Sequence, residues 1–190
     1  QLANPVVLAP MTGVSDLPFR RMASELGAGL VVSEMVASRE LVNARPDVVR
    51  RAAGLGLTPR VIQLVGSEAG WMAEGARLAE ASGADIVDIN MGCPSRLVTG
   101  RLSGSALMRE PDFAISLVEA VVGAVKIPVT LKMRLGWDAR LRNAPEIARR
   151  AEAAGVRLVT VHGRTRCQFF KGEADWSEVA AVKSAVSIPV

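Results

Sequence analysis

The sequence predicts an α/β fold, because strand-like and helix-like segments alternate along all 190 residues. Such alternation is typical of parallel βαβ units. An internal repeat narrows the fold further: "ELGAGLVVSE", "EASGADIVDIN" and "EAAGVRLVTVH" each run from a glutamate through a helix-ending glycine into a strand. Repeated equivalent units favour a TIM (β/α)8 barrel over an open sheet, and no G-x-G-x-x-G follows the first strand.

Each expected element follows from its local pattern. Strands are expected at residues 6–10, 30–35, 60–66, 85–90, 127–134 and 157–163, and residues 188–190 resemble the start of a seventh. Helices are expected at residues 16–26, 46–53, 68–82, 110–125, 144–154 and 175–186. Six strands and the start of a seventh form about three quarters of a barrel of ~250 residues. We therefore expect residues 1–190 to be an incomplete barrel from the N-terminal side of a longer enzyme.

The composition excludes several classes of protein. Hydrophobic residues make up 49% of the chain, which is ample for a core, yet no apolar run is long enough to span a membrane. No signal peptide is recognisable. Two cysteines without a CxxC motif and a single histidine argue against a disulfide framework or a structural zinc site, and fit a reducing cytoplasm. The net charge of +4, with arginines in clusters, permits a nucleic-acid partner.

Polar residues follow the predicted strands where a barrel carries its functional groups, at the C-terminal strand ends. Lys132 and Arg134 alternate with Leu131 and Met133, so both cations share one face of their strand. Cations at alternate positions are hard to explain as core packing, and they indicate a water-filled cavity that attracts anions. The full set expected at the mouth comprises Ala9, Pro10, Met11, Thr12, Glu34, Gln63, Asn90, Cys93, Lys132, Arg134, His162 and Arg164.

Cys93 is the candidate catalytic residue. A lone cysteine is usually a small buried hydrophobe, and Cys167 is interpreted as incidental. Cys93 differs because it follows a strand and precedes a flexible, glycine-rich loop with Arg96 and Arg101. A thiol is mostly protonated at neutral pH and can act as a general acid. A nucleophilic thiolate would instead need a histidine partner, for which His162 is the only candidate.

The residues alone leave other roles open. Lys132 and His162 could stabilise negative charge on a reduced flavin, or Lys132 could form a Schiff base in an aldolase. Glu34 could simply neutralise Lys132 or an arginine.

Six motifs carry a family resemblance. In order along the chain, "LAPMTGVSDLPFR", "QLVG", "DINMGCPS", "GSALM", "LKMRLGW" and "VHGRTR" resemble the successive motifs of bacterial tRNA-dihydrouridine synthases. "SEM" after the second strand and "HGRTRCQFFKGEADW" are most similar to the B subgroup. The six motifs span essentially the whole chain.

The resemblance implies an FMN enzyme that reduces specific uridines in tRNA to 5,6-dihydrouridine, with NADPH as the reductant. Hydride would reach carbon 6 of uracil, and Cys93 would protonate carbon 5. The implied cofactor-binding residues are Pro10, Met11, Thr12, Gln63, Lys132 and His162. The implied substrate-binding residues are Asn90, Arg134, Arg164, Arg96 and Arg101, and no metal is implied.

The resemblance also implies a cytoplasmic monomer. The flavin phosphate site and a helical, tRNA-binding C-terminal domain are expected beyond residue 190. Three alternatives remain: an FMN-dependent barrel oxidoreductase that acts on a free small molecule such as a pyrimidine, a Schiff-base aldolase that uses Lys132, and a noncatalytic RNA-binding module in which Cys93 is inert.

Overall fold

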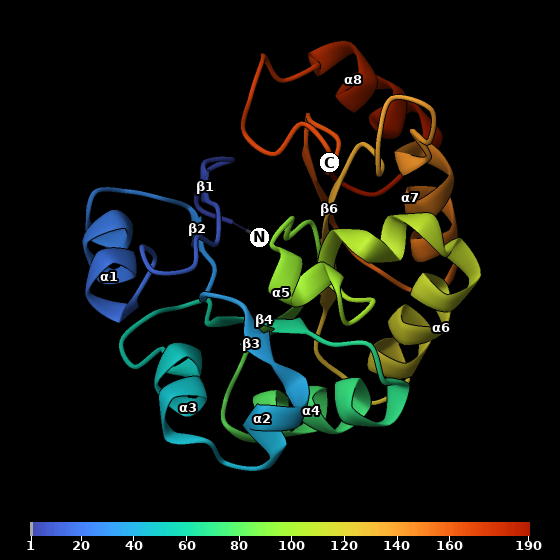
Figure 1. Cartoon of the computed structure of the whole chain (residues 1–190). Coiled ribbons are helices and arrows are strands. Elements are labelled where there is room, and N and C mark those ends of the chain that lie inside the picture. The colour runs from blue at the N-terminus through green and yellow to red at the C-terminus, as the bar shows by residue number, and fades with distance from the viewer. Residues whose placement is uncertain (1) are drawn as a thin grey trace.

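The computed structural model describes residues 2–190. Its strands are β1 (Val7–Leu8), β2 (Leu30–Val31), β3 (Val36–Ala37), β4 (Val61–Val65), β5 (Ile86–Met91), β6 (Val129–Arg134) and β7 (Val159–His162). Its helices are α1 (Leu17–Glu25), α2 (Ser38–Val42), α3 (Pro46–Ala52), α4 (Ala69–Ala81), α5 (Arg96–Thr99), the 3-10 helix η1 (Gly104–Arg109), α6 (Pro111–Val122), α7 (Ala144–Ala153) and α8 (Trp176–Ala185). Figure 1 shows the strands near the centre, with α1, α3, α4, α6 and α7 arranged around them.

All strand pairs are parallel, and neighbours follow the order of the sequence. One sheet pairs β1 with β2, and the other runs β3-β4-β5-β6-β7. A bridge between Val32 and Val61 joins the two sheets. Sequential parallel strands with a helix in each long connection form the wall of a TIM barrel.

The two faces of the larger sheet differ in polarity. In the register, Gln63 pairs with Asp88 and Asp88 with Thr130, while Asn90 pairs with Lys132. Because side chains alternate along a strand, these residues share the inner face. The intervening residues are apolar and fully buried against the helices, and they include Ile62, Leu64, Val87, Ile89, Leu131 and Met133. The main core therefore lies between sheet and helices, which leaves the inner face free for polar groups.

Helix ends follow the expected signals. Asp16 caps α1 by accepting a hydrogen bond from the Phe19 N–H, and Asp175 caps α8 through the N–H groups of Ser177 and Glu178. These side chains satisfy donors that the helices leave unpaired. The capping aspartates therefore set where both helices begin.

Three expectations about the elements are wrong in detail. Of the strand expected at residues 30–35, only Leu30 and Val31 form a strand (β2), while β3 begins after residue 35 and is followed directly by α2. Residues 188–190 form no strand, although the Val159 N–H donates to the Pro189 carbonyl at 3.0 Å. The segment after Cys93, expected to be a flexible loop, instead contains α5 and η1. Side-chain and backbone hydrogen bonds such as Ser103 Oγ to the Val98 carbonyl (2.9 Å) order it.

Candidate active site

A cavity of about 790 Å³ opens at the C-terminal ends of the strands. It brings together Cys93 with most of the residues expected at the mouth, from segments far apart in sequence. The lining residues are Ala9, Pro10, Met11, Thr12, Met35, Gln63, Asn90, Gly92, Cys93, Pro94, Ser95, Arg96, Lys132, Arg134, His162, Phe169 and Phe170. Of the predicted cofactor and substrate residues, only Arg101 and Arg164 do not line this cavity.

A chain of hydrogen bonds crosses the floor of the cavity. The Asp88 carboxylate accepts from Thr130 Oγ1 and from Gln63 Nε2, both at 2.6 Å. Gln63 Oε1 in turn accepts from Asn90 Nδ2 at 2.8 Å. An ionised carboxylate only accepts, so Asp88 sets the orientation of the Gln63 amide and, through it, that of Asn90.

The chain ends at the turn that carries the thiol. Asn90 Oδ1 accepts from the N–H groups of Gly92 and Cys93 at 3.1 and 3.0 Å. The Cys93 carbonyl accepts from both the N–H and the hydroxyl of Ser105. The backbone of Cys93 is therefore held on both sides, while within residues 2–190 its Sγ has no hydrogen-bond partner.

Lys132 places at the floor of the cavity an ammonium group that has no partner within residues 2–190. Burial lowers the pKa of its ammonium group and the nearby Asp88 carboxylate partly offsets this, while Arg134 adds to the lowering. Burial raises the pKa of Asp88, and its hydrogen bonds and Lys132 oppose that rise. Among the described residues, Lys132 Nζ has no hydrogen-bond or ion-pair partner, so it is available to an anionic or polar ligand.

His162 is neutral in this setting. Burial, together with Arg134, Lys132 and Arg164, lowers the pKa of its imidazole to about 4. Arg164 Nη1 lies 3.1 Å from His162 Nε2. Because a guanidinium can only donate, Nε2 is the acceptor and the ring proton resides on Nδ1. Arg164 thus lies behind His162 instead of lining the cavity, with its other nitrogens on the carbonyls of Lys171 and Gly172.

Arg134 is buried and clamps two segments together. Its Nε donates to the Gly92 carbonyl, and its Nη1 donates to the carbonyls of Thr165 and Phe169. It lies 5.4 Å from the Phe170 ring centre. Desolvation by burial lowers its pKa to about 10, yet it stays charged at neutral pH. The expected substrate residue therefore also has a structural role, since it ties the Cys93 turn to the segment after β7.

Sequence reasoning missed several residues of the site. Asp88 is absent from the residues expected at the mouth, although it stands two positions before Asn90 and this spacing places both on one strand face. Phe169 and Phe170 form an aromatic rim that only the path of the chain after β7 brings to the cavity. The suggested pairing of Glu34 with Lys132 is not observed. Instead, Glu34 Oε1 accepts from the Gly13 N–H at 2.6 Å and supports the segment after β1.

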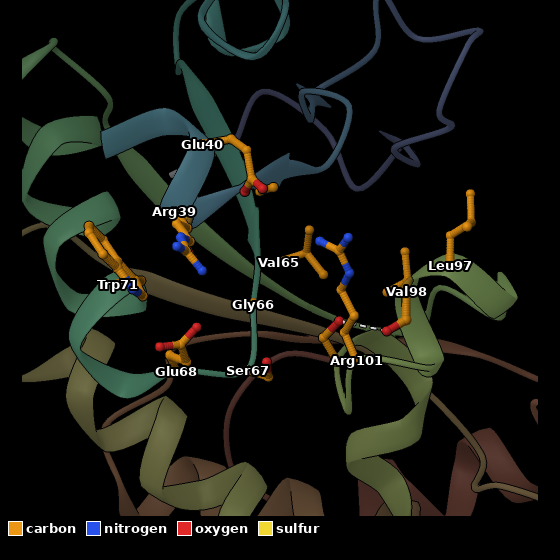
Figure 2. A pocket seen from close by; sticks show the side chains of 13 residues that line it. Arg39, Glu40, Val65, Gly66, Ser67, Glu68, Trp71, Leu97, Val98 and Arg101 are labelled. Atoms are coloured by element: carbon orange, nitrogen blue, oxygen red, sulfur yellow. Dashed lines mark hydrogen bonds between the residues drawn. The ribbon is translucent and has the colours of Figure 1, made fainter. Parts of the chain in front are cut away.

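Arg101 belongs to a second cavity, of about 460 Å³, beside the first (Figure 2). This cavity lies over the ends of β3 and β4, with α2 and the start of α4 on one side and α5 on the other. It is lined by Ala37, Ser38, Arg39, Glu40, Val65, Gly66, Ser67, Glu68, Trp71, Leu97, Val98, Arg101 and Ser103. Arg101 therefore does not line the cavity of Cys93, whereas Arg96, the other loop arginine that the resemblance implies for substrate binding, does.

The larger cavity suits a flavin. Ala9, Pro10, Met11 and Met35 provide an apolar wall for a planar ring, and Lys132 provides an unpartnered cation for a polar edge that gains negative charge on reduction. These features fit FMN, which the sequence resemblance implies. Residues 2–190 include no cluster of three or more His, Cys, Asp or Glu side chains suited to a metal ion.

A family model described as "Dihydrouridine synthase (Dus)" matches residues 7–190. The chain belongs to the dihydrouridine synthase family. The expected TIM-barrel fold is confirmed by this membership and by the parallel strand order. A solved mandelate oxidase mutant has the same kind of fold, with a TM-score of 0.51 and 20% identity over 98% of this chain and 57% of that one.

Curated relatives of this dihydrouridine synthase family member are closely similar. A probable tRNA-dihydrouridine synthase from Rhizobium leguminosarum is 61% identical over 98% of this chain. A tRNA-dihydrouridine synthase B from Pseudomonas putida is 47% identical over 100% of it. The chain spans 59% and 56% of the lengths of these two proteins. Among the described helices of the chain, none has the length and apolarity needed to cross a membrane.

Proposed function

We propose that this chain provides the catalytic part of an enzyme that reduces specific uridines in tRNA to 5,6-dihydrouridine. The observation that supports it most is the convergence of the Cys93 thiol, the Lys132 cation and the Asn90 amide in one cavity of a dihydrouridine synthase fold. The curated names of the relatives support tRNA as the substrate. We further propose that the enzyme is a cytoplasmic monomer, and that the rest of the barrel and a helical tRNA-binding domain lie outside these residues.

The residues divide into two groups by their place in the cavity. Pro10, Met11 and Thr12 would border the FMN ring, with Gln63, Lys132 and His162 at its polar edge. When bound, FMN that has been reduced by NADPH supplies the hydride for carbon 6 of uracil. His162 accepts from Arg164 through Nε2, so only its Nδ1–H is available as a donor.

The protein's own chemical step is a proton transfer. Cys93 Sγ donates its proton to carbon 5 of the uracil, the sulfur is left as a thiolate, and water restores its proton. No hydrogen bond joins Sγ to His162 within the described residues, which disfavours a Cys–His nucleophile pair. Asn90 and Arg134 hold the turn of Cys93 close to the base, and Arg96 at the cavity edge faces the phosphates.

Two alternatives use the same cavity. A flavin barrel that acts on a free pyrimidine would need the cofactor residues but not Arg96 at the rim. A Schiff-base aldolase would use Lys132, whose lowered pKa suits a nucleophilic amine, and would need no flavin. The similarity to tRNA-dihydrouridine synthases favours the RNA substrate over both.

The test uses the complete open reading frame that contains this chain, with FMN, NADPH and tRNA lacking dihydrouridine. Digestion and mass spectrometry should show uridine gaining two hydrogens only when both NADPH and FMN are present. Bound flavin without any gain in mass would point to the small-molecule oxidoreductase. Substrate trapped by borohydride without flavin would point to the aldolase.

Replacing the thiol tests its role. Cys93→Ala should lower the rate of uridine reduction by about 10²-fold or more, the usual contribution of a positioned general acid. FMN content and its reduction by NADPH should change little. Cys167→Ala, at the exposed second cysteine, is the matched control and should retain wild-type rates. Equal rates for Cys93→Ala and wild type would refute the proton-donor assignment.

A further inference from the structure

The second cavity shares a wall with the cavity of Cys93. In α5, Arg96 lines the Cys93 cavity, while Leu97 and Val98 line the second cavity. Arg101, in the turn after α5, also lines the second cavity. Four helical residues extend only about 6 Å along the axis. A nucleotide next to one whose base enters the Cys93 cavity can therefore reach the second opening by crossing this short helix.

The second cavity carries an aromatic ring and unpaired charges of both signs. The Arg39 guanidinium lies 5.8 Å from the centre of the Trp71 ring. In Figure 2 these two residues stand side by side, and Arg101 stands across the opening from them, next to Val98. Glu40 and Glu68 supply carboxylates. Within residues 2–190, none of these four charged side chains has a hydrogen-bond or ion-pair partner.

This combination selects a class of ligand. A simple anion would meet two carboxylates as well as two arginines, which makes the cavity a poor site for phosphate alone. A nucleobase, in contrast, offers a flat face for stacking on Trp71, acceptors for the arginines, and N–H groups for the carboxylates. Adenine, guanine and cytosine carry the exocyclic amino group that a glutamate accepts most directly.

We propose that the second cavity binds the base of a nucleotide next to the target uridine, stacked on Trp71 and contacted by Arg101. The proposal rests on the proposed function, because it assumes that RNA enters the neighbouring cavity. It gives Arg101 a substrate role at a place that the sequence alone did not indicate. A base site of this kind would also let the enzyme select target uridines by the identity of the neighbouring nucleotide.

A double-mutant cycle, which combines a substitution in the full-length protein with an abasic site in the RNA, tests this proposal. The probe is a fluorescently labelled single-stranded RNA of five nucleotides with a central uridine, and its dissociation constant is measured by anisotropy. Trp71→Ala should weaken binding by about five- to 150-fold, the usual range for one stacked base. Trp71→Phe keeps an aromatic face and should retain most of the affinity.

Abasic sites in the probe identify the base involved. Each flanking position is made abasic in turn, and one position should lose about as much affinity in the wild type as Trp71→Ala does. In Trp71→Ala, the same abasic site should have no further effect, because the stacked pair is already missing. Trp176→Ala, at a tryptophan that is 78% exposed on α8 and lines neither cavity, is the control and should bind normally.

The outcomes separate this inference from the proposed function. Additive losses at every flanking position, or no loss for Trp71→Ala, would overturn the inference. If the wild type reduces uridine but Trp71→Ala and the abasic sites act independently, the inference fails and the proposed function stands. Coupled binding without uridine reduction would support the nucleotide site and overturn the proposed reaction.

Discussion

At the level of single residues, most polar groups on the inner face are already paired with one another. Asp88, Gln63 and Asn90 form one hydrogen-bonded chain, which leaves Lys132 Nζ and Cys93 Sγ without hydrogen-bond partners among the described residues. Buried polar groups that are fully hydrogen-bonded are held rigidly in place. The two groups left free are therefore the natural candidates for chemistry.

Asp88 should act as a positioning residue for Cys93. Asp88→Leu removes the acceptor of both Gln63 and Thr130, so the amide chain loses its fixed direction and the turn at Cys93 should loosen. We expect iodoacetamide to alkylate Cys93 at least about fivefold faster, the equivalent of one hydrogen bond, while the exposed Cys167 reacts as before. Alkylation is followed by peptide mass spectrometry.

The conservative variant provides the control for this prediction. Asp88→Asn keeps an oxygen for Gln63 and can turn its amide group toward the Thr130 hydroxyl, so it should stay close to the wild-type rate. The circular dichroism of both variants must match that of the wild type at the temperature of the assay. An unchanged Cys93 rate in Asp88→Leu would show that the chain does not hold the turn.

His162 should titrate far below an ordinary histidine. Its pKa of about 4 lies below the unfolded value of 6.5, so the unfolded chain binds more protons between these values. This part of the stability is complete above about pH 6.5 and is lost as the pH falls toward 4. NMR of the imidazole, assigned with His162→Gln, should give a midpoint near pH 4.

The pH dependence of unfolding provides a second measurement of His162. Between pH 7 and 4.5, the unfolding free energy of the wild type should fall more steeply than that of His162→Gln. Asp88 has the opposite sign, because its raised pKa stabilises the fold as the pH falls, but its contribution is common to both proteins. A midpoint near 6.5 would mean that the imidazole is solvated and not held by Arg164.

At the level of elements, the segments after β6 and β7 stabilise each other. The Arg166 N–H donates to the Gly136 carbonyl and the Cys167 N–H donates to the Trp137 carbonyl, at 3.0 and 2.9 Å. The guanidinium carbons of Arg109 and Arg166 lie 4.4 and 4.7 Å from the centre of the Trp137 ring. These contacts position the segment that carries Phe169 and Phe170 at the cavity.

Gly136 should be essential to that arrangement. A Cβ added there would lie 2.0 Å from the Leu141 carbonyl oxygen, which belongs to the backbone and cannot move aside cheaply. Gly136→Ala should therefore lower the free energy of unfolding by about 2 kcal/mol or more, measured by urea denaturation. Gly70→Ala, in α4 with nothing within 4 Å, is the control and should be neutral or stabilising by up to about 1 kcal/mol. Equal stability of Gly136→Ala and the wild type would contradict this account of the turn.

At the level of the whole molecule, the barrel separates stability from function. The apolar outer face of the sheet packs against α4, α6 and α7, and the polar inner face is free to form the site. Arg96, at the start of α5, and Arg101, just after its end, are exposed and line the first and the second cavity, respectively. The net charge of +4 is modest, so the placement of these cations matters more for a polyanion than their number.

RNA binding should therefore depend on salt. The logarithm of the association constant should fall linearly with the logarithm of the salt concentration, and Arg96→Ala should reduce the slope by about 1. Arg157→Ala, at an exposed arginine that precedes β7 and lines neither cavity, is the control and should keep the wild-type slope. Binding of the five-nucleotide RNA to the full-length protein from 50 to 300 mM salt would provide the measurement. A salt-independent affinity would argue against phosphate contacts near α5.

The sequence by itself determined the alternation of the main strands and helices, the barrel class, and the inner position of Cys93, Asn90 and Lys132. It could do so because periodicity and helix signals are local, and because parallel strands bring their C-terminal ends to one edge. Only the tertiary structure decided which polar groups are already paired. It showed Arg134 bound to three carbonyls, Arg164 behind His162, and Arg101 in a second cavity. Hydrogen-bond partners far apart in the chain depend on how the segments after the strands pack, and no local pattern encodes that.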